Sequence, residues 1–94
     1  MKVTKLIRTC DMCPSQWEGI DENGHSIYIR YRWGTLLIYR SKRPSTDISA
    51  ALDGDLVLDL KLGHDYDGYL DYETLKEVCK EHGIILPDDA VRWE

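Results

Sequence analysis

The alternation of apolar and polar residues between positions 17 and 40 most constrains what this chain can fold into. That segment reads WEGIDENGHSIYIRYRWGTLLIYR, and residues 27–33 alternate strictly. A period of two is typical of β-strands with one buried face. Asn23-Gly24 interrupts the pattern, and this dipeptide favours a two-residue type I′ turn because both central residues need a positive φ. The sequence therefore predicts an antiparallel hairpin closed at Asn23-Gly24.

A two-residue loop at this point fixes which residues of the two strands lie opposite each other. It pairs Ile20 with Ile27, and it places Trp17 on the other face of the hairpin, opposite Arg30. Gly34 then ends the second strand, and residues 36–40 return as the third. These segments together predict an antiparallel meander.

Two more strands and a helix complete the predicted architecture. Residues 3–9 suit a short first strand, and DLVLDLKL (residues 55–62) places four leucines at alternate positions, on one face of a later strand. One helical turn is expected at residues 48–52. Asp71 fits a helix N-cap, and Gly83 fits the stop of that helix. We expect a single domain over residues 1–94, of the α+β class: an antiparallel β-meander of four to five strands with one C-terminal α-helix packed on the sheet.

Composition and cysteine content narrow the compartment and the chemistry. The chain has 94 residues, of which 43% are hydrophobic, with three cysteines and no apolar run long enough for a signal peptide or a membrane span. We therefore expect a cytoplasmic protein with reduced thiols and no contact with membranes. No recognisable pairing of nucleophile and base appears, and no glycine loop for phosphate, so we expect no enzymatic activity.

Charge divides the chain into two unequal halves. Residues 1–46 carry eight basic groups against four acidic ones, whereas residues 47–94 carry four basic groups against thirteen acidic ones. The acidic half can neutralise the basic half, or it can present a negative surface to a basic protein partner. The partner-binding candidates in that half are Asp55, Asp59, Asp65 and Asp67.

The cysteines allow a metal site. Cys10-x-x-Cys13 and Cys79-x-x-His82 together form a Cys₃His set, which is one of the usual ligand combinations of structural zinc. The alternative is that Cys79 is a small core residue on the apolar face of the helix, and that His82 is favoured in the last turn by the helix dipole. A redox pair of Cys10 and Cys13 is less favoured, because Pro14 and the strand after it differ from the usual helix start.

A basic and aromatic strand face gives a second lead. Tyr28, Arg30 and Arg32 share one face of the second hairpin strand, and the predicted register sets Trp17 beside them. Arginines interleaved with aromatic rings can bind nucleic acid through phosphate contacts and stacking. Such arginines can equally pack over rings of their own chain or pair with its acidic groups.

The run CDMCPSQWEG (residues 10–19), together with RYRWG (residues 30–34), resembles small proteins of bacteria and their phages to which no activity is assigned. The resemblance implies a chain that acts stoichiometrically on a host or defence protein. Our leading hypothesis is therefore a small acidic non-enzymatic binding protein, of the kind that phages use as inhibitors. The rival hypothesis is a zinc-stabilised module that contacts nucleic acid through the basic and aromatic sheet face.

Overall fold

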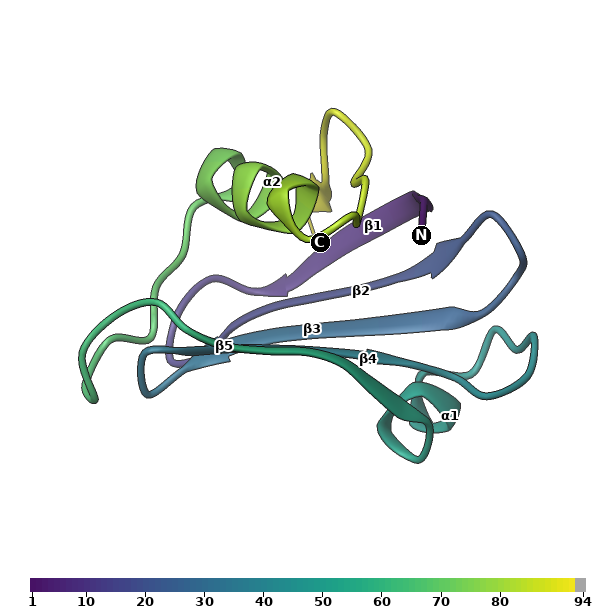
Figure 1. The fold of residues 1–94 in the computed structure, drawn as a ribbon, viewed down its shortest axis with the longest axis horizontal. Coiled ribbons are helices and arrows are strands. Elements are labelled where there is room, and N and C mark those ends of the chain that lie inside the picture. The colour runs from purple at the N-terminus through teal and green to yellow at the C-terminus, as the bar shows by residue number, and fades with distance from the viewer. Residues whose placement is uncertain (93–94) are drawn as a thin grey trace.

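One six-stranded sheet organises the chain in the computed structural model, which describes residues 1–92 (Figure 1). The strand order is β5-β4-β3-β2-β1-β6, in which the first five are antiparallel neighbours and β6 runs parallel to β1. The expected α+β fold, with its meander and C-terminal helix, is confirmed. The elements in chain order are β1 (Val3–Cys10), β2 (Ser15–Asp21), β3 (Ser26–Arg32), β4 (Thr35–Arg40), α1 (Ile48–Leu52), β5 (Asp55–Lys61), α2 (Tyr72–Glu81) and β6 (Val91–Arg92).

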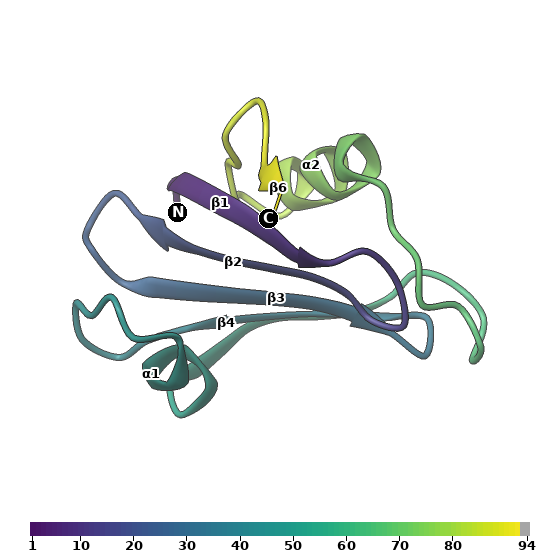
Figure 2. The same ribbon diagram turned by 180° about the vertical axis from the view of Figure 1, so that it is seen from behind.

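The hydrophobic core lies between α2 and one face of the sheet. Leu75 and Cys79 of α2 are fully buried in the same cluster as Trp17, Ile29 and other strand residues. The short helix α1 accompanies the other face, and Figures 1 and 2 show the strands lying between the two helices. The core therefore lies on the α2 face of the sheet, and the opposite face is covered only in part, by α1.

The ends of α2 follow the sequence signals. The Asp71 side chain accepts hydrogen bonds from the backbone N–H and the hydroxyl of Thr74, as an N-cap does. At the other end Gly83 has a φ of +77°, and the Ile84 N–H donates to the carbonyl of Cys79 over 2.9 Å. This is the Schellman pattern, and it explains why a glycine stands at position 83.

The first hairpin differs from its predicted register by one residue. Its loop has three residues (22–24) and joins Asp21 to His25; only Gly24 has a positive φ. Such a loop is a type I turn closed by a left-handed glycine, and it shifts the pairing so that Trp17 lies opposite Ile29. The predicted pairing of Trp17 with Arg30 is wrong, because a shift of one residue exchanges the two faces of a strand.

Asp21 holds the observed turn in place. Its side chain is almost completely buried, and Oδ1 accepts the backbone N–H groups of Asn23 and His25 at 3.0 and 2.9 Å. Its Oδ2 accepts Arg40 Nε at 2.6 Å. An aspartate that accepts backbone donors two and four residues later stabilises a tight loop without needing a left-handed asparagine.

The two-residue turn with two positive φ angles occurs one hairpin later. Trp33 (φ +57°) and Gly34 (φ +71°) connect β3 to β4, and Arg32 pairs with Thr35 across the turn. A Cβ at position 34 would lie only 2.3 Å from the His64 carbonyl oxygen, so glycine is required here by space as well as by φ. Trp33, predicted as the end of a strand face, is instead an exposed residue at the hairpin tip.

A β-bulge alters the face of β5. Leu58 pairs with Ile38 and Leu56 with Tyr39, so Val57 is an extra residue in the ladder. The expected single face of four leucines is therefore interrupted, and Leu56 is 49% exposed. The straight part of the strand begins at Leu58.

Replacing Gly24 by valine should lower the free energy of unfolding by roughly 1–2 kcal/mol, because a β-branched residue resists a positive φ. Chemical denaturation followed by circular dichroism measures the change. The control is Asn23→Val, one residue earlier, where φ is not positive and a much smaller change is expected. Equal losses in the two variants would contradict the three-residue loop.

Candidate binding surfaces

The CDMCPS segment forms a loop that is held by a distant part of the chain. Cys13 N–H donates to the Gly68 carbonyl at 2.8 Å, and Met12 forms an antiparallel bridge with Tyr69. A Cβ at position 68 would lie 3.0 Å from Cys13 Cα, so the two backbones pack closely. The motif that suggested chemistry in the sequence is thus a packed connection between β1 and β2.

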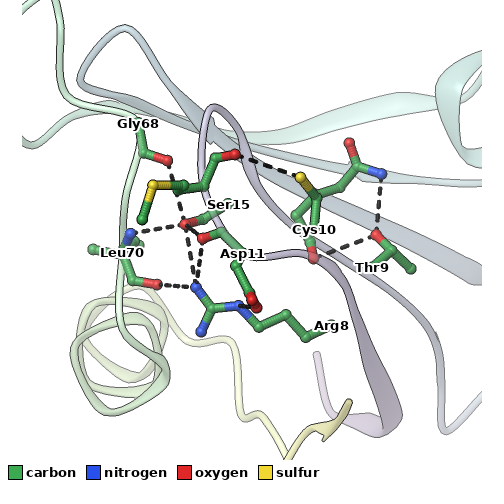
Figure 3. A network of polar contacts seen from close by, with 9 residues as sticks. Arg8, Thr9, Cys10, Asp11, Ser15, Gly68 and Leu70 are labelled. Carbon is green, nitrogen blue, oxygen red and sulfur yellow. Dashed lines mark hydrogen bonds and ion pairs between the residues drawn. The ribbon is translucent and has the colours of Figure 1, made fainter. Parts of the chain in front are cut away.

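Arg8 and Ser15 tie this loop to the start of α2 (Figure 3). The buried Ser15 hydroxyl accepts the Leu70 N–H at 2.9 Å and donates to the Asp11 carbonyl. Arg8 Nη2 donates to the carbonyl oxygens of Asp11 and Leu70, at 2.8 and 3.1 Å. One arginine therefore satisfies carbonyl groups of two segments that are about 60 residues apart in sequence.

The predicted zinc ligands do not come together. Cys10 and Cys13 lie at this loop, Cys79 is fully buried on the inner side of α2, and His82 is exposed at the C-cap of that helix. Among residues 1–92, no three His, Cys, Asp or Glu side chains are close enough to hold a metal ion. The Cys₃His set is therefore not assembled, because the inward-facing side of α2 directs Cys79 into the apolar core.

Burial explains the chemistry of Cys79. It raises the pKa of the Cys79 thiol to about 12, because the thiolate would lose its hydration in the core. A neutral thiol behaves as a small hydrophobic side chain. The structure thus supports the alternative interpretation of Cys79 as a core residue.

A cleft of about 450 Å³ opens between the cysteine loop, the start of α2 and the segment before β6. Its volume is in the range of small ligand sites. Three aromatic side chains and three carboxylates surround one guanidinium in its lining: Trp17, Tyr69, Tyr72, Asp11, Glu73, Asp89 and Arg8.

Arg8, which lines this cleft, contacts two aromatic rings. Its guanidinium carbon lies 4.8 Å from the centre of the Trp17 ring and 5.4 Å from that of Tyr69. Its Nε is 3.3 Å from Asp11 Oδ1. The arginine is thus fixed by stacking and by charge, and it keeps the aromatic walls in place.

Carboxylates give the cleft a negative character despite Arg8. Three acidic groups and one basic group line it, for a formal charge of −2. The Glu73 side chain is 78% exposed and the Tyr69 residue 48% exposed, so both remain accessible. Two buried donors of lining residues, Trp17 Nε1 and Arg8 Nε, have no hydrogen-bond acceptor among residues 1–92, although Arg8 Nε lies 3.3 Å from Asp11 Oδ1.

The acidic residues predicted from the sequence lie apart from this cleft. Asp55 is paired with Lys42 and Asp65 with Lys61, at 2.7 and 2.6 Å. Asp59 is exposed on β5. These groups are held mainly by the chain's own cations, which supports the self-neutralising alternative for Asp55 and Asp65.

Asp67 serves the fold. It accepts a 2.6 Å hydrogen bond from the Tyr31 hydroxyl, and this bond lowers the pKa of Asp67. Burial, followed by the bond to Asp67, raises the pKa of Tyr31 to about 12. The pair joins the buried end of β3 to the loop after β5.

The predicted basic and aromatic face is present in the structure, but Trp17 is not part of it. Tyr28, Arg30 and Arg32 lie on the partly covered face, because their neighbours Ile27, Ile29 and Tyr31 point into the core. The Arg32 guanidinium stacks on Trp33 at 4.7 Å from the ring centre. Trp17 was predicted to join this face, but it is fully buried on the opposite one.

Sequence reasoning missed most of the cleft. Its parts come from residues 8–17, 69–73 and 89–90, and no single stretch shows their proximity. One local signal is Arg8, a charged residue that follows the core residues Val3 and Leu6 on β1. A buried charge in a strand needs partners, and here these partners form the cleft.

No helix among residues 1–92 has the length and apolar character to span a membrane. No protein-family model, curated protein or solved structure matches this chain.

Proposed function

We propose that this chain is a small non-enzymatic binding protein that receives a cationic side chain of a protein partner in the cleft around Arg8. The observation that carries the proposal is that Tyr69 and Tyr72 line one cleft of about 450 Å³ together with three carboxylates. Accessible tyrosine rings beside carboxylates suit lysine or arginine, whose long apolar stem packs on the rings while the charged end meets the carboxylates.

The charge of the cleft supports a basic partner over an acidic one. Its lining has a formal charge of −2, and Arg8 is already engaged by Asp11 and by the carbonyl of Leu70. An anionic ligand would be repelled by Glu73 and Asp89, which line the same cleft.

The proposal keeps the stoichiometric mode of action that the resemblance implies, but it places the binding surface at the cleft instead of at the acids of β5. The acids of the β5 region are paired with Lys42 and Lys61, and Glu73 is paired with Lys76 at 3.3 Å, but Glu73 and Asp89 also line a concave site. We also propose the cytoplasm as the compartment, because all three cysteines are free thiols.

A second candidate function uses the partly covered sheet face. Arg30, Arg32 and Trp33 line a shallow depression of about 210 Å³ on that face. Trp33 is held there with a left-handed backbone and 55% exposure, and an exposed ring beside two arginines suits a nucleobase and its phosphate. The overall charge of −5 opposes this candidate, because it repels a polyanion.

The test is a titration of ¹⁵N-labelled protein with a blocked peptide of alternating lysine and arginine. We expect amide shifts concentrated at Met12, Tyr69, Tyr72 and Ala90, and weaker binding at high salt because exposed charges are screened. Replacing Glu73 by glutamine and Asp89 by asparagine should weaken binding about tenfold.

The matched control removes the same charge elsewhere. Asp55→Asn combined with Asp65→Asn should leave peptide affinity within about twofold of the original. If binding depends on Asp55 and Asp65 and not on Glu73 and Asp89, the partner binds the acidic residues predicted from the sequence and not the cleft. Shifts at Arg30 and Trp33 with an oligothymidylate probe, and none with the peptide, would favour the nucleic-acid candidate.

A further inference from the structure

The outer edge of β5 is the open end of the sheet. Within residues 1–92, β5 pairs only with β4, whereas the opposite edge of the sheet is extended by β6. Residues at or beside this edge are apolar and exposed: Leu56 is 49% exposed, Val57 39% and Leu62 38%. An exposed leucine-rich edge strand is a template for another strand.

Ladder geometry identifies which backbone groups of β5 are directed outward. The Leu62 N–H donates to the Gly34 carbonyl at 2.8 Å, and in an antiparallel ladder every second residue bonds to the same neighbour. Leu60 and Leu58 therefore direct their backbone groups toward β4. Asp59 and Lys61 direct theirs away from the sheet, and the bulge at Val57 limits the straight edge to residues 58–62.

These constraints select one occupant and one register. We propose that β5 pairs antiparallel with β5 of a second copy of this chain, about a two-fold axis at Leu60. Asp59 of each copy then lies opposite Lys61 of the other, and the two outward-directed residues form hydrogen-bonded pairs. Moving the axis by one residue in either direction would place Asp59 against Asp59, or Lys61 against Lys61, and like charges directly opposite destabilise a pair of strands.

Apolar pairing supports the same register. Leu60 lies opposite Leu60, and each Leu58 lies opposite Leu62 of the other copy, so the exposed side chain of Leu62 becomes covered. At present Lys61 pairs with Asp65, with side chains 53% and 86% exposed, and its Nζ also donates to the Trp33 carbonyl at 3.1 Å. Such a surface ion pair contributes little, so Lys61 can exchange Asp65 for Asp59 of the second copy.

Sedimentation equilibrium of the full chain, at concentrations from about 10 µM to about 1 mM, tests the proposal. We expect a monomer–dimer equilibrium. Lys61→Asp should raise the dissociation constant at least about tenfold, because each Asp59 then faces a carboxylate of the other copy instead of an ammonium group. The double exchange Asp59→Lys with Lys61→Asp restores opposite charges across the axis, and it should return the constant to within about threefold of the original.

Lys5→Asp on β1 makes the same change of charge away from this edge, and it should leave the dimer unchanged. Circular dichroism shows whether each variant is folded. A chain that stays monomeric at all concentrations would overturn the proposal. A dimer that is weakened equally by Lys61→Asp and by the double exchange, or by neither, would place the interface elsewhere and overturn it as well.

Discussion

Trp17→Ala should lower the free energy of unfolding by about 4 kcal/mol, the largest effect we expect from a single substitution in this chain. The Trp17 side chain is fully buried, pairs across the strands with Ile29, and carries the Arg8 guanidinium on its ring. Removing it leaves a cavity in the core and exposes the stacking face of Arg8. Urea denaturation followed by far-ultraviolet circular dichroism measures the loss, and Trp17→Phe should lose less because much of the ring remains.

Trp33→Ala is the matched control, because it removes the same side chain from a position that is 55% exposed. We expect a change within about 0.5 kcal/mol, as is usual for surface substitutions. Equal effects of the two variants would mean that Trp17 lies on the surface, as the two-residue turn implied. The comparison thus tests the register of the first hairpin as well as the core.

Asp21→Ala should cost about 3 kcal/mol at neutral pH, because it leaves Arg40 without its carboxylate and removes the acceptor of two turn N–H groups. The neighbouring Glu22→Ala, on an exposed side chain, should change the stability by less than about 0.5 kcal/mol. Similar losses at the two positions would contradict the role of Asp21 in closing the turn.

The contribution of Asp21 should depend on pH in a defined direction. Burial acts to raise the pKa of Asp21, but hydrogen bonds from Arg40, His25 and Asn23 outweigh it and the pKa is lowered. The folded state therefore favours the carboxylate. The stabilisation is fully present above the unfolded pKa of about 4 and is lost as the pH falls through the lower pKa of the folded state.

Denaturation at several pH values measures this dependence. The difference in unfolding free energy between the original chain and Asp21→Asn should be constant from about pH 5.5 to 7.5 and should shrink below about pH 4. A difference that grows as the pH falls would show that the folded state raises the pKa of Asp21, in contradiction to the hydrogen-bond geometry.

Local signals in the sequence determined much of the architecture. Alternation between residues 27 and 32 indicated a strand, Asp71 and Gly83 bounded the last helix, and the turn at residues 48–52 was expected where α1 occurs. Each of these signals acts between neighbours in the chain, through backbone sterics, capping bonds or the side-chain period of two. They can therefore be evaluated without knowing what packs against them.

Only the tertiary structure decided the register and the faces. The preference of Asn23-Gly24 for a two-residue turn was outweighed by Asp21, whose carboxylate is held by Arg40 from the far strand of the next hairpin. That one-residue shift moved Trp17 from a surface to the core. Registers depend on such distant contacts because either choice satisfies the alternation equally well.

The candidate site depended on tertiary structure even more than the strand registers did. Cys10, Cys13, Cys79 and His82 are residue types that bind zinc, but Cys79 points from α2 into the core and so lies apart from Cys10 and Cys13. The cleft, by contrast, combines segments that are about 60 residues apart, joined through Arg8 and Ser15 to the carbonyl and N–H of Leu70. The sequence by itself determined the strands, the helix ends and the charge of each half. Their packing decided which side chains meet, because the burial of Trp17, Cys79 and Asp21 is a property of the whole sheet and helix.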